Sequence, residues 1–266
     1  MTIQASPTND CLTMSVDGAV ARIVFNNPRR KNAVDFAGWI RLAALMTDLG
    51  ARGDIRAIVL SGAGGDFCAG ADISEFDAVR RDAETARAYE AANSAAFRAI
   101  RESRAPVVAA IDGICFGGGF GIAAACDLRV ATPRARFAVP AARLGLAYPV
   151  DAMIDIVSAA GPQMARYLTM TAQTIDAATA LAAGFLLEVV EAGRLAARAG
   201  EIANQIAASA PLSVRASRLA IAATVSGDRT LAAEAKAAGD ATFESADYAE
   251  GRAAFKERRP PVFKGR

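Results

Sequence analysis

The stretch Pro106-Val-Val-Ala-Ala-Ile-Asp-Gly-Ile-Cys-Phe-Gly-Gly-Gly-Phe-Gly121 joins two predicted elements through three consecutive glycines. Its apolar first part is rich in β-branched residues and predicts a buried strand, and the residues from Phe120 onward predict a helix. Glycine has no Cβ and tolerates positive φ, so backbone N–H groups in such a turn can face a ligand. At the start of a helix these groups favour a negatively charged oxygen. The stretch therefore indicates either an anion-binding turn or a tight structural turn.

Composition narrows the classes of function. The chain has 266 residues, 53% of them apolar and 22% charged, which predicts one large domain, alone or with a small appendage. The net charge of +2 and the lack of basic clusters interleaved with aromatics argue against nucleic-acid binding. Because the chain contains no histidine, Ser-His and Cys-His nucleophiles and His-based metal sites are excluded, and we expect no metal.

Compartment and membrane association follow from three further observations. Residues 1–18 are polar and lack an apolar segment, so we expect no secretory signal. The four cysteines show no C-x-x-C spacing, which favours a reduced, cytoplasmic compartment. The stretch 105–126 carries one charge, but its proline and glycines favour a buried strand and helix over a membrane span.

Hydrophobic periodicity predicts strands alternating with helices, followed by helices alone. Strands are expected at 20–25, 57–61, 105–111, 127–131, 137–140 and 185–190, and helices at 35–49, 83–102, 149–161 and 176–183. Asp35 is the expected N-cap of the first helix. The pattern predicts an α/β core over residues 1–193 and a helical region over 194–266 that covers the site.

A second glycine-rich stretch, Gly62-Ala-Gly-Gly-Asp-Phe-Cys-Ala-Gly-Ala-Asp-Ile73, also follows a predicted buried strand. Neither stretch matches G-x-G-x-x-G, a Walker A loop or a G-x-S-x-G elbow. Two loops that each supply one backbone N–H to the same oxygen meet the requirement of an oxyanion hole. The pair therefore predicts a site that polarises a carbonyl group.

The chain resembles the enoyl-CoA hydratase/isomerase (crotonase) superfamily over nearly its whole length. The resemblance rests on segments 27–33, 57–73, 105–119, 124–131, 135–137, 143–146, 245–251 and 254–258, which occur in family order and spacing. It implies a spiral of ββα units with a helical C-terminal region, and assembly as a homotrimer or a dimer of trimers. It also implies coenzyme A thioesters as substrates, with no further cofactor.

The resemblance also assigns roles to individual residues. The two oxyanion donors fall on the backbone N–H groups of Ala71 and Gly118, which would hold the thioester oxygen as it becomes an enolate. Contacts to coenzyme A fall on Arg30, Lys31, Ala33, Ala69, Ala71, Asp72, Ile73, Phe255 and Lys256, the last two reaching a neighbouring subunit.

The chain departs from the family at the acid/base positions. The hydratases use two glutamates, which fall on Gly121 and Ala141 here, and neither residue transfers a proton. An aspartate used by other members falls on Pro149. Ordinary hydration of an enoyl thioester by the family mechanism is therefore doubtful.

Three alternatives remain open for the reaction. Tyr148 aligns with a tyrosine of the methylmalonyl-CoA decarboxylases and would orient a carboxylate or protonate an enolate. Asp151 could serve as a substitute acid or base, although it could also be the N-cap of a helix that begins near residue 152. Glu75 is a more distant candidate for the same role as substitute acid or base. The third alternative is a protein that binds acyl-CoA without turnover.

Overall fold

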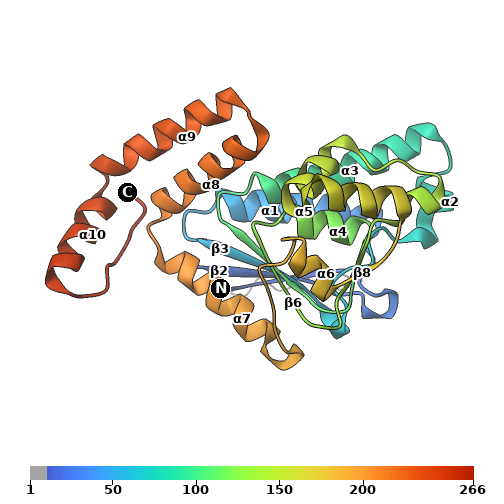
Figure 1. Ribbon diagram of the computed structural model, residues 1–266, viewed down its shortest axis with the longest axis horizontal. Helices are drawn as coiled ribbons and strands as arrows, with labels where there is room; N and C mark the ends of the chain where they lie inside the picture. Colours follow the sequence, from blue (N-terminus) through green and yellow to red (C-terminus); the bar gives the residue numbers. More distant parts are fainter. Residues whose placement is uncertain (1–10) are drawn as a thin grey trace.

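The computed structural model describes residues 11–266 and is built on a six-stranded sheet in the order β1-β2-β3-β4-β6-β9 (Figure 1). Its strands are β1 Leu12–Asp17, β2 Val20–Phe25, β3 Ala57–Gly62, β4 Val107–Ile111, β6 Leu128–Ala131 and β9 Glu188–Val189. β1 pairs antiparallel with β2, and all other pairs are parallel. Strand β1 was not predicted, because five of its six residues are exposed and give no buried run. The prediction that residues 1–18 contain no secretory signal concerns mainly residues 1–10, which lie outside the described residues.

Apolar layers cover both faces of this sheet. On one face, Ile23, Ile58 and Leu60 pack in a core with helices α1 (Phe36–Ala51), α3 (Ala83–Arg101) and α4 (Gly118–Ala125). On the other face, Val59 and Val108 pack against helix α7 (Leu195–Ala208). Burial on both sides explains why β3 and β4 read as continuous apolar runs in the sequence.

A second, three-stranded sheet in the order β5-β7-β8 continues the spiral. Its strands are β5 Ile114–Phe116, β7 Arg136–Ala138 and β8 Ile175–Asp176. One turn was expected over residues 112–119, but within it Ile114–Phe116 forms strand β5, which follows β4 after Asp112-Gly113 and leads into α4. Because β5 belongs to the second sheet, the chain turns after β4, and the glycine cluster comes to lie beside the loop that follows β3.

Most predicted helices are confirmed, and two boundaries are corrected. Asp35 caps α1 by accepting from the Gly38 N–H at 2.7 Å. α4 begins at Gly118 rather than Phe120. Helix α5 (Val150–Thr171) does not end near Gly161: that residue interrupts it with φ of 75°, and the helix resumes because proline is accepted at a first helical position. The strand expected at 185–190 is reduced to β9.

Helices α8 (Pro211–Ser226), α9 (Arg229–Ala241) and α10 (Ala246–Glu257) form an arm that extends away from the sheet (Figure 1). α7, by contrast, supplies one face of the core. The expected division at residue 193 stays a prediction, and the packing of α7 would instead set the start of the arm after Ala208. No helix within residues 11–266 is long and apolar enough to cross a membrane.

Arg218 of α8 attaches the arm to the core. Its guanidinium pairs with Asp127 at 2.5 Å and donates to the carbonyls of Arg101 at 2.6 Å and Ile100 at 3.3 Å, and also to that of Ser103. The carbonyls of Ile100 and Arg101 lie at the end of α3, so the cation also complements the helix dipole.

Arg218→Met should therefore lower the free energy of unfolding by roughly 2–4 kcal/mol, because it leaves a carboxylate and several carbonyls without their donor. Urea denaturation measures the change. Arg215→Met, on an exposed position of the same helix, is the matched control and should change stability by less than about 0.5 kcal/mol. Equal losses in the two variants would contradict the role of Arg218.

Candidate functional site

The loop after β3 lies against the basic loop at residues 30–34. The Ala69 N–H donates to Lys31 O at 2.9 Å, the Val34 N–H to Gly70 O at 2.8 Å, and the Asp72 N–H to Val34 O at 2.9 Å. In this short parallel ladder alternate residues face opposite ways, so the Ala71 N–H is directed away from the basic loop.

The buried side chain of Asn32 also holds the basic loop against the loop after β3, a role that was not predicted from the sequence. Its side chain is 1% exposed, and its Nδ2 donates to the carbonyls of Ala63 at 2.8 Å and Asp66 at 2.6 Å. Its Oδ1 accepts from the Asn27 N–H at 2.9 Å. The amide therefore ties the basic loop to the glycine-rich loop after β3, and its positive φ of 58° is typical of asparagine in a tight turn.

The two glycine loops are joined to each other. The Cys68 N–H donates to Ile114 O at 2.9 Å, and the Phe116 N–H donates to Cys68 O at 3.0 Å. Beyond these bonds Gly70 approaches the start of α4 so closely that a Cβ at residue 70 would lie 2.8 Å from the Gly118 nitrogen. The fold thus brings together the segments that carry Ala71 and Gly118, as an oxyanion hole requires.

Ala71 and Gly118 are the predicted oxyanion donors. Among residues 11–266, neither the Ala71 N–H nor the Gly118 N–H has a hydrogen-bond acceptor. Gly118 is the first residue of α4. An N–H at this position has no acceptor within the helix and forms part of the positive end of the helix dipole. Residue 118 must also be small, because a Cβ there would lie 2.8 Å from the indole carbons Cζ2 and Cη2 of Trp39.

Two aromatic side chains fill the space at Gly121. A Cβ at this residue would lie 2.7 Å from Phe97 Cζ and 2.8 Å from the Tyr148 hydroxyl oxygen. Trp39 packs edge-on against Phe97 at 5.7 Å and donates from Nε1 to the Tyr89 hydroxyl at 3.1 Å. A glutamate at position 121 would therefore force one or both of these side chains to move.

The Tyr148 hydroxyl donates to Gly117 O at 2.7 Å. Gly117 precedes Gly118, the predicted oxyanion donor. The Gly117 carbonyl also accepts the Gly121 N–H at 3.1 Å, so the phenol helps to hold the glycine loop in place. Burial raises the pKa of Tyr148 well above its usual value, and the nearby Glu90 carboxylate raises it further. Its proton is therefore held firmly and directed at the backbone.

The candidate contacts for coenzyme A flank the Ala71 side of the site. Arg30 pairs with Asp72 at 2.5 Å and also donates to Ser74. Burial alone would raise the pKa of Asp72, but hydrogen bonds from Ser74 and Arg30 outweigh it and hold that pKa below its usual value. Lys31 and Ile73 are exposed, and Ala33 is buried beneath the basic loop. The ion pair shows that Asp72 orients Arg30, in addition to its predicted contact with coenzyme A.

The alternative acids lie in different surroundings. Asp151 is not an N-cap: it lies in the first turn of α5, after Pro149, and its carboxylate accepts from Arg98 of α3 at 3.1 Å. Glu75 accepts from the Phe36 N–H at 2.6 Å and so supports the start of α1. Burial raises the pKa of Glu75, and the neighbouring carboxylates Asp35 and Asp72 add to that effect.

Asp155, one turn beyond Asp151, gives a test by pH. It is 4% exposed and pairs with Arg101 at 2.7 Å, but burial outweighs the ion pair and raises its pKa to about 6. Because this folded-state pKa lies above the unfolded value of about 3.9, the protonated carboxyl stabilises the fold. That contribution is complete below about pH 4 and is lost as pH rises through 6.

Asp155→Asn cannot titrate, so the stability of wild type relative to this variant should fall by about 2–3 kcal/mol from pH 4 to pH 7. Chemical denaturation at several pH values measures the difference. A difference that stays constant with pH would mean that the Arg101 ion pair dominates over burial.

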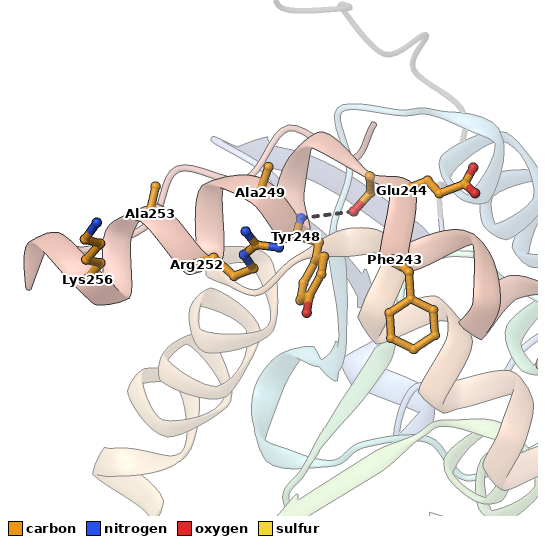
Figure 2. Close-up of a pocket in the computed structure, with 8 residues that line it drawn as sticks. Phe243, Glu244, Tyr248, Ala249, Arg252, Ala253 and Lys256 are labelled. Carbon is orange, nitrogen blue, oxygen red and sulfur yellow. Dashed lines mark hydrogen bonds between the residues drawn. The ribbon is translucent and has the colours of Figure 1, made fainter.

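Phe255 and Lys256 lie on α10, which Figure 1 shows away from α4 in the same chain. Phe255 is 87% exposed. A hollow of about 400 Å³ on this arm is lined by Phe243, Tyr248, Arg252 and Lys256. Lys256 lies at one end of this row of residues (Figure 2). The hollow lies apart from the two glycine loops and is not the carbonyl site. Within residues 11–266 no cluster of acidic residues or cysteines is arranged to hold a metal ion.

The sequence profile described as enoyl-CoA hydratase/isomerase matches residues 15–266. The chain belongs to this family. It is 34% identical over 246 residues to the short-chain-enoyl-CoA hydratase of Clostridium acetobutylicum, covering 91% of this chain and 93% of that protein. It is 31% identical over 261 residues to the carnitinyl-CoA dehydratase of Proteus mirabilis, covering 96% of this chain and 98% of the relative.

Solved structures of the family have the same fold. An enoyl-CoA hydratase/carnithine racemase from Magnetospirillum magneticum superposes with a TM-score of 0.90 at 35% identity, covering 97% of each chain. A putative enoyl-CoA hydratase/isomerase family protein from Hyphomonas neptunium gives a TM-score of 0.91 at 34% identity, covering 96% of this chain and 98% of its own. The expected crotonase-like α/β fold with a helical C-terminal region is therefore confirmed.

Proposed function

We propose that this chain binds an acyl-CoA thioester and stabilises its enolate through the backbone N–H groups of Ala71 and Gly118. The observation that carries the proposal is the convergence of two loops whose donors have no acceptor among residues 11–266. Relatives named as enoyl-CoA hydratase and carnitinyl-CoA dehydratase support an acyl-CoA-processing enzyme of the crotonase superfamily. Each donor contributes roughly 3–4 kcal/mol of transition-state stabilisation in such sites.

The proposed reaction does not use the carboxylate pair of the hydratases. Neither Gly121 nor Ala141 carries an acid, and Phe97 and Tyr148 occupy the space beside Gly121. Any proton transfer must therefore come from another group or from solvent. Enolate stabilisation itself needs only the oxyanion hole and the N-terminus of α4.

Coenzyme A would lie along the Ala71 side of the site. Arg30 and Lys31 would meet its phosphates, and the backbone from Ala69 to Ile73 would follow its adenine and pantetheine. A homotrimer or dimer of trimers would let Phe255 and Lys256 reach the coenzyme A of a neighbour, which the exposure of Phe255 supports.

Two rival functions differ from this proposal in measurable ways. A methylmalonyl-CoA decarboxylase would use Tyr148, yet its hydroxyl proton is engaged with Gly117 O. We therefore place Tyr148 as a positioning residue, and Asp151 outside the reacting centre beside Arg98. A protein that only binds acyl-CoA would keep the oxyanion hole and lack turnover.

The test is to incubate the protein with crotonyl-CoA and methylmalonyl-CoA, following enoyl absorbance and release of CO₂, while calorimetry measures binding. We expect binding of both thioesters and no fast hydration. Hydration near the diffusion limit would contradict the proposal, and CO₂ release that Tyr148→Phe abolishes would establish the decarboxylase. Binding without turnover of any thioester would establish the acyl-CoA binder.

A further inference from the structure

Two buried polar atoms lack a partner, and they lie in one region of the molecule. Within residues 11–266, Arg80 Nε and Asn93 Oδ1 are the buried side-chain nitrogen and oxygen atoms with no hydrogen bond. Asn93 is 7% exposed. Leaving such an atom unpaired in a folded protein is costly, so each one calls for an explanation, and an absent ligand group is one explanation.

These residues share a face of α3 that borders the proposed thioester site. Residues 90, 93 and 97 lie along one side of the helix, one turn apart. Phe97, the last of them, is the side chain that meets the position of a Cβ at Gly121. Gly121 lies one turn after the proposed oxyanion donor Gly118, so Phe97 brings this face of α3 to within one helical turn of the proposed carbonyl site.

The charges in this region balance. Arg80 pairs with Glu90 at 2.6 Å, and its guanidinium lies over the rings of Phe76 at 4.6 Å and Tyr89 at 4.3 Å. The ion pair is therefore satisfied without a charged ligand, and Glu90 would repel a carboxylate. Asn93 Oδ1 accepts only, whereas Arg80 Nε donates only. An uncharged group that can both donate and accept fits this environment, and a hydroxyl is the simplest such group.

We propose that the acyl chain of the substrate carries a hydroxyl group beyond C3, which donates to Asn93 Oδ1 in the region formed by Arg80, Glu90 and Asn93. This inference rests on the proposed function, because it needs the thioester held at Ala71 and Gly118. Asn93 lies four residues from Phe97, about 6 Å along the helix, so several methylene groups separate the hydroxyl from the carbonyl.

The test compares three thioesters of equal chain length by calorimetry: 6-hydroxyhexanoyl-CoA, hexanoyl-CoA and adipoyl-CoA. The hydroxyl compound should bind about tenfold more tightly than hexanoyl-CoA, and adipoyl-CoA most weakly. Asn93→Leu should remove the preference while hexanoyl-CoA still binds, and Asn93→Ser, which keeps an uncharged acceptor, should retain part of it. Asn204→Leu, on the exposed side of α7, is the matched control.

Stability adds a readout that binding does not give. Because Asn93→Leu removes an unpaired acceptor without creating a cavity, its Tm should be unchanged or higher. Equal affinity for the hydroxyl and alkyl thioesters, or tighter binding of adipoyl-CoA, would overturn the inference while leaving the proposed function intact. Failure of all three thioesters to bind would overturn the proposed function, and the inference with it.

Discussion

Gly118→Pro is expected to abolish polarisation of the bound thioester carbonyl and to lower any turnover by roughly 10²–10³-fold, because proline has no N–H to donate. Proline is accepted at the first position of a helix, which Gly118 occupies in α4, so the helix itself should form. The measurement is the ¹³C resonance of [1-¹³C]butyryl-CoA, which we expect to move downfield on binding to the wild type and to stay near its free value in the variant.

Gly118→Ala provides the matched control for this experiment. Both substitutions place a Cβ about where it would meet Trp39, at 2.8 Å from the indole carbons, but alanine keeps the N–H. Gly118→Ala therefore controls for the contact of Cβ with Trp39, while the proline variant differs from it by the lost N–H and by the ring carbons bonded to the nitrogen. A downfield shift that persists in Gly118→Pro would show that another group polarises the carbonyl.

Gly121→Glu is expected to lower the free energy of unfolding by about 3–5 kcal/mol rather than to restore a hydratase. The new Cβ would meet Phe97 at 2.7 Å and Tyr148 at 2.8 Å, and the carboxylate would be buried without a partner. In a chain of this size the loss corresponds to a fall in Tm of about 10 °C. Thermal denaturation followed by circular dichroism measures it.

Gly239→Glu on α9 is the control, because a Cβ there has no neighbour within 4 Å, and its Tm should change little. Adding Tyr148→Ala to Gly121→Glu should recover part of the stability, since residues in contact are not additive. The double variant Gly121→Glu with Ala141→Glu should still hydrate crotonyl-CoA poorly. An unchanged Tm in Gly121→Glu would contradict this prediction and would mean that the space beside Gly121 accommodates an acid.

The sequence predicted most elements of the core because their patterns are local. The runs in β3 and β4 are apolar at every buried position, and Asp35 caps α1 as its position before an amphipathic segment indicates. The strand β1 was missed because its side chains are mainly exposed. Helix α5 was predicted too short because a glycine and a proline normally end a helix, whereas here a second helix starts at that point.

In the candidate site, too, some features have a local sequence pattern and others do not. The two glycine stretches and the missing acids are visible in the sequence, as is the likeness to a known family. Asn32, Trp39 and Phe97 gave no signal, because an asparagine in a loop or an aromatic residue in a helix has no local mark of its partner. Their roles depend on contacts across 31, 79 and 24 residues of chain, respectively.

By itself the sequence determined the two strand–glycine–helix segments and the absence of histidine, and it has Gly121 and Ala141 where the resemblance predicts glutamates. Only the tertiary structure decided that Gly70 packs against Gly118, that the Tyr148 hydroxyl is engaged with Gly117, and that Phe97 fills the space beside Gly121. It also placed the unpaired Asn93 on the same helix face as Phe97. The physical reason is that hydrogen bonding and close packing join atoms that are distant in the chain, whereas periodicity and composition report only on neighbours.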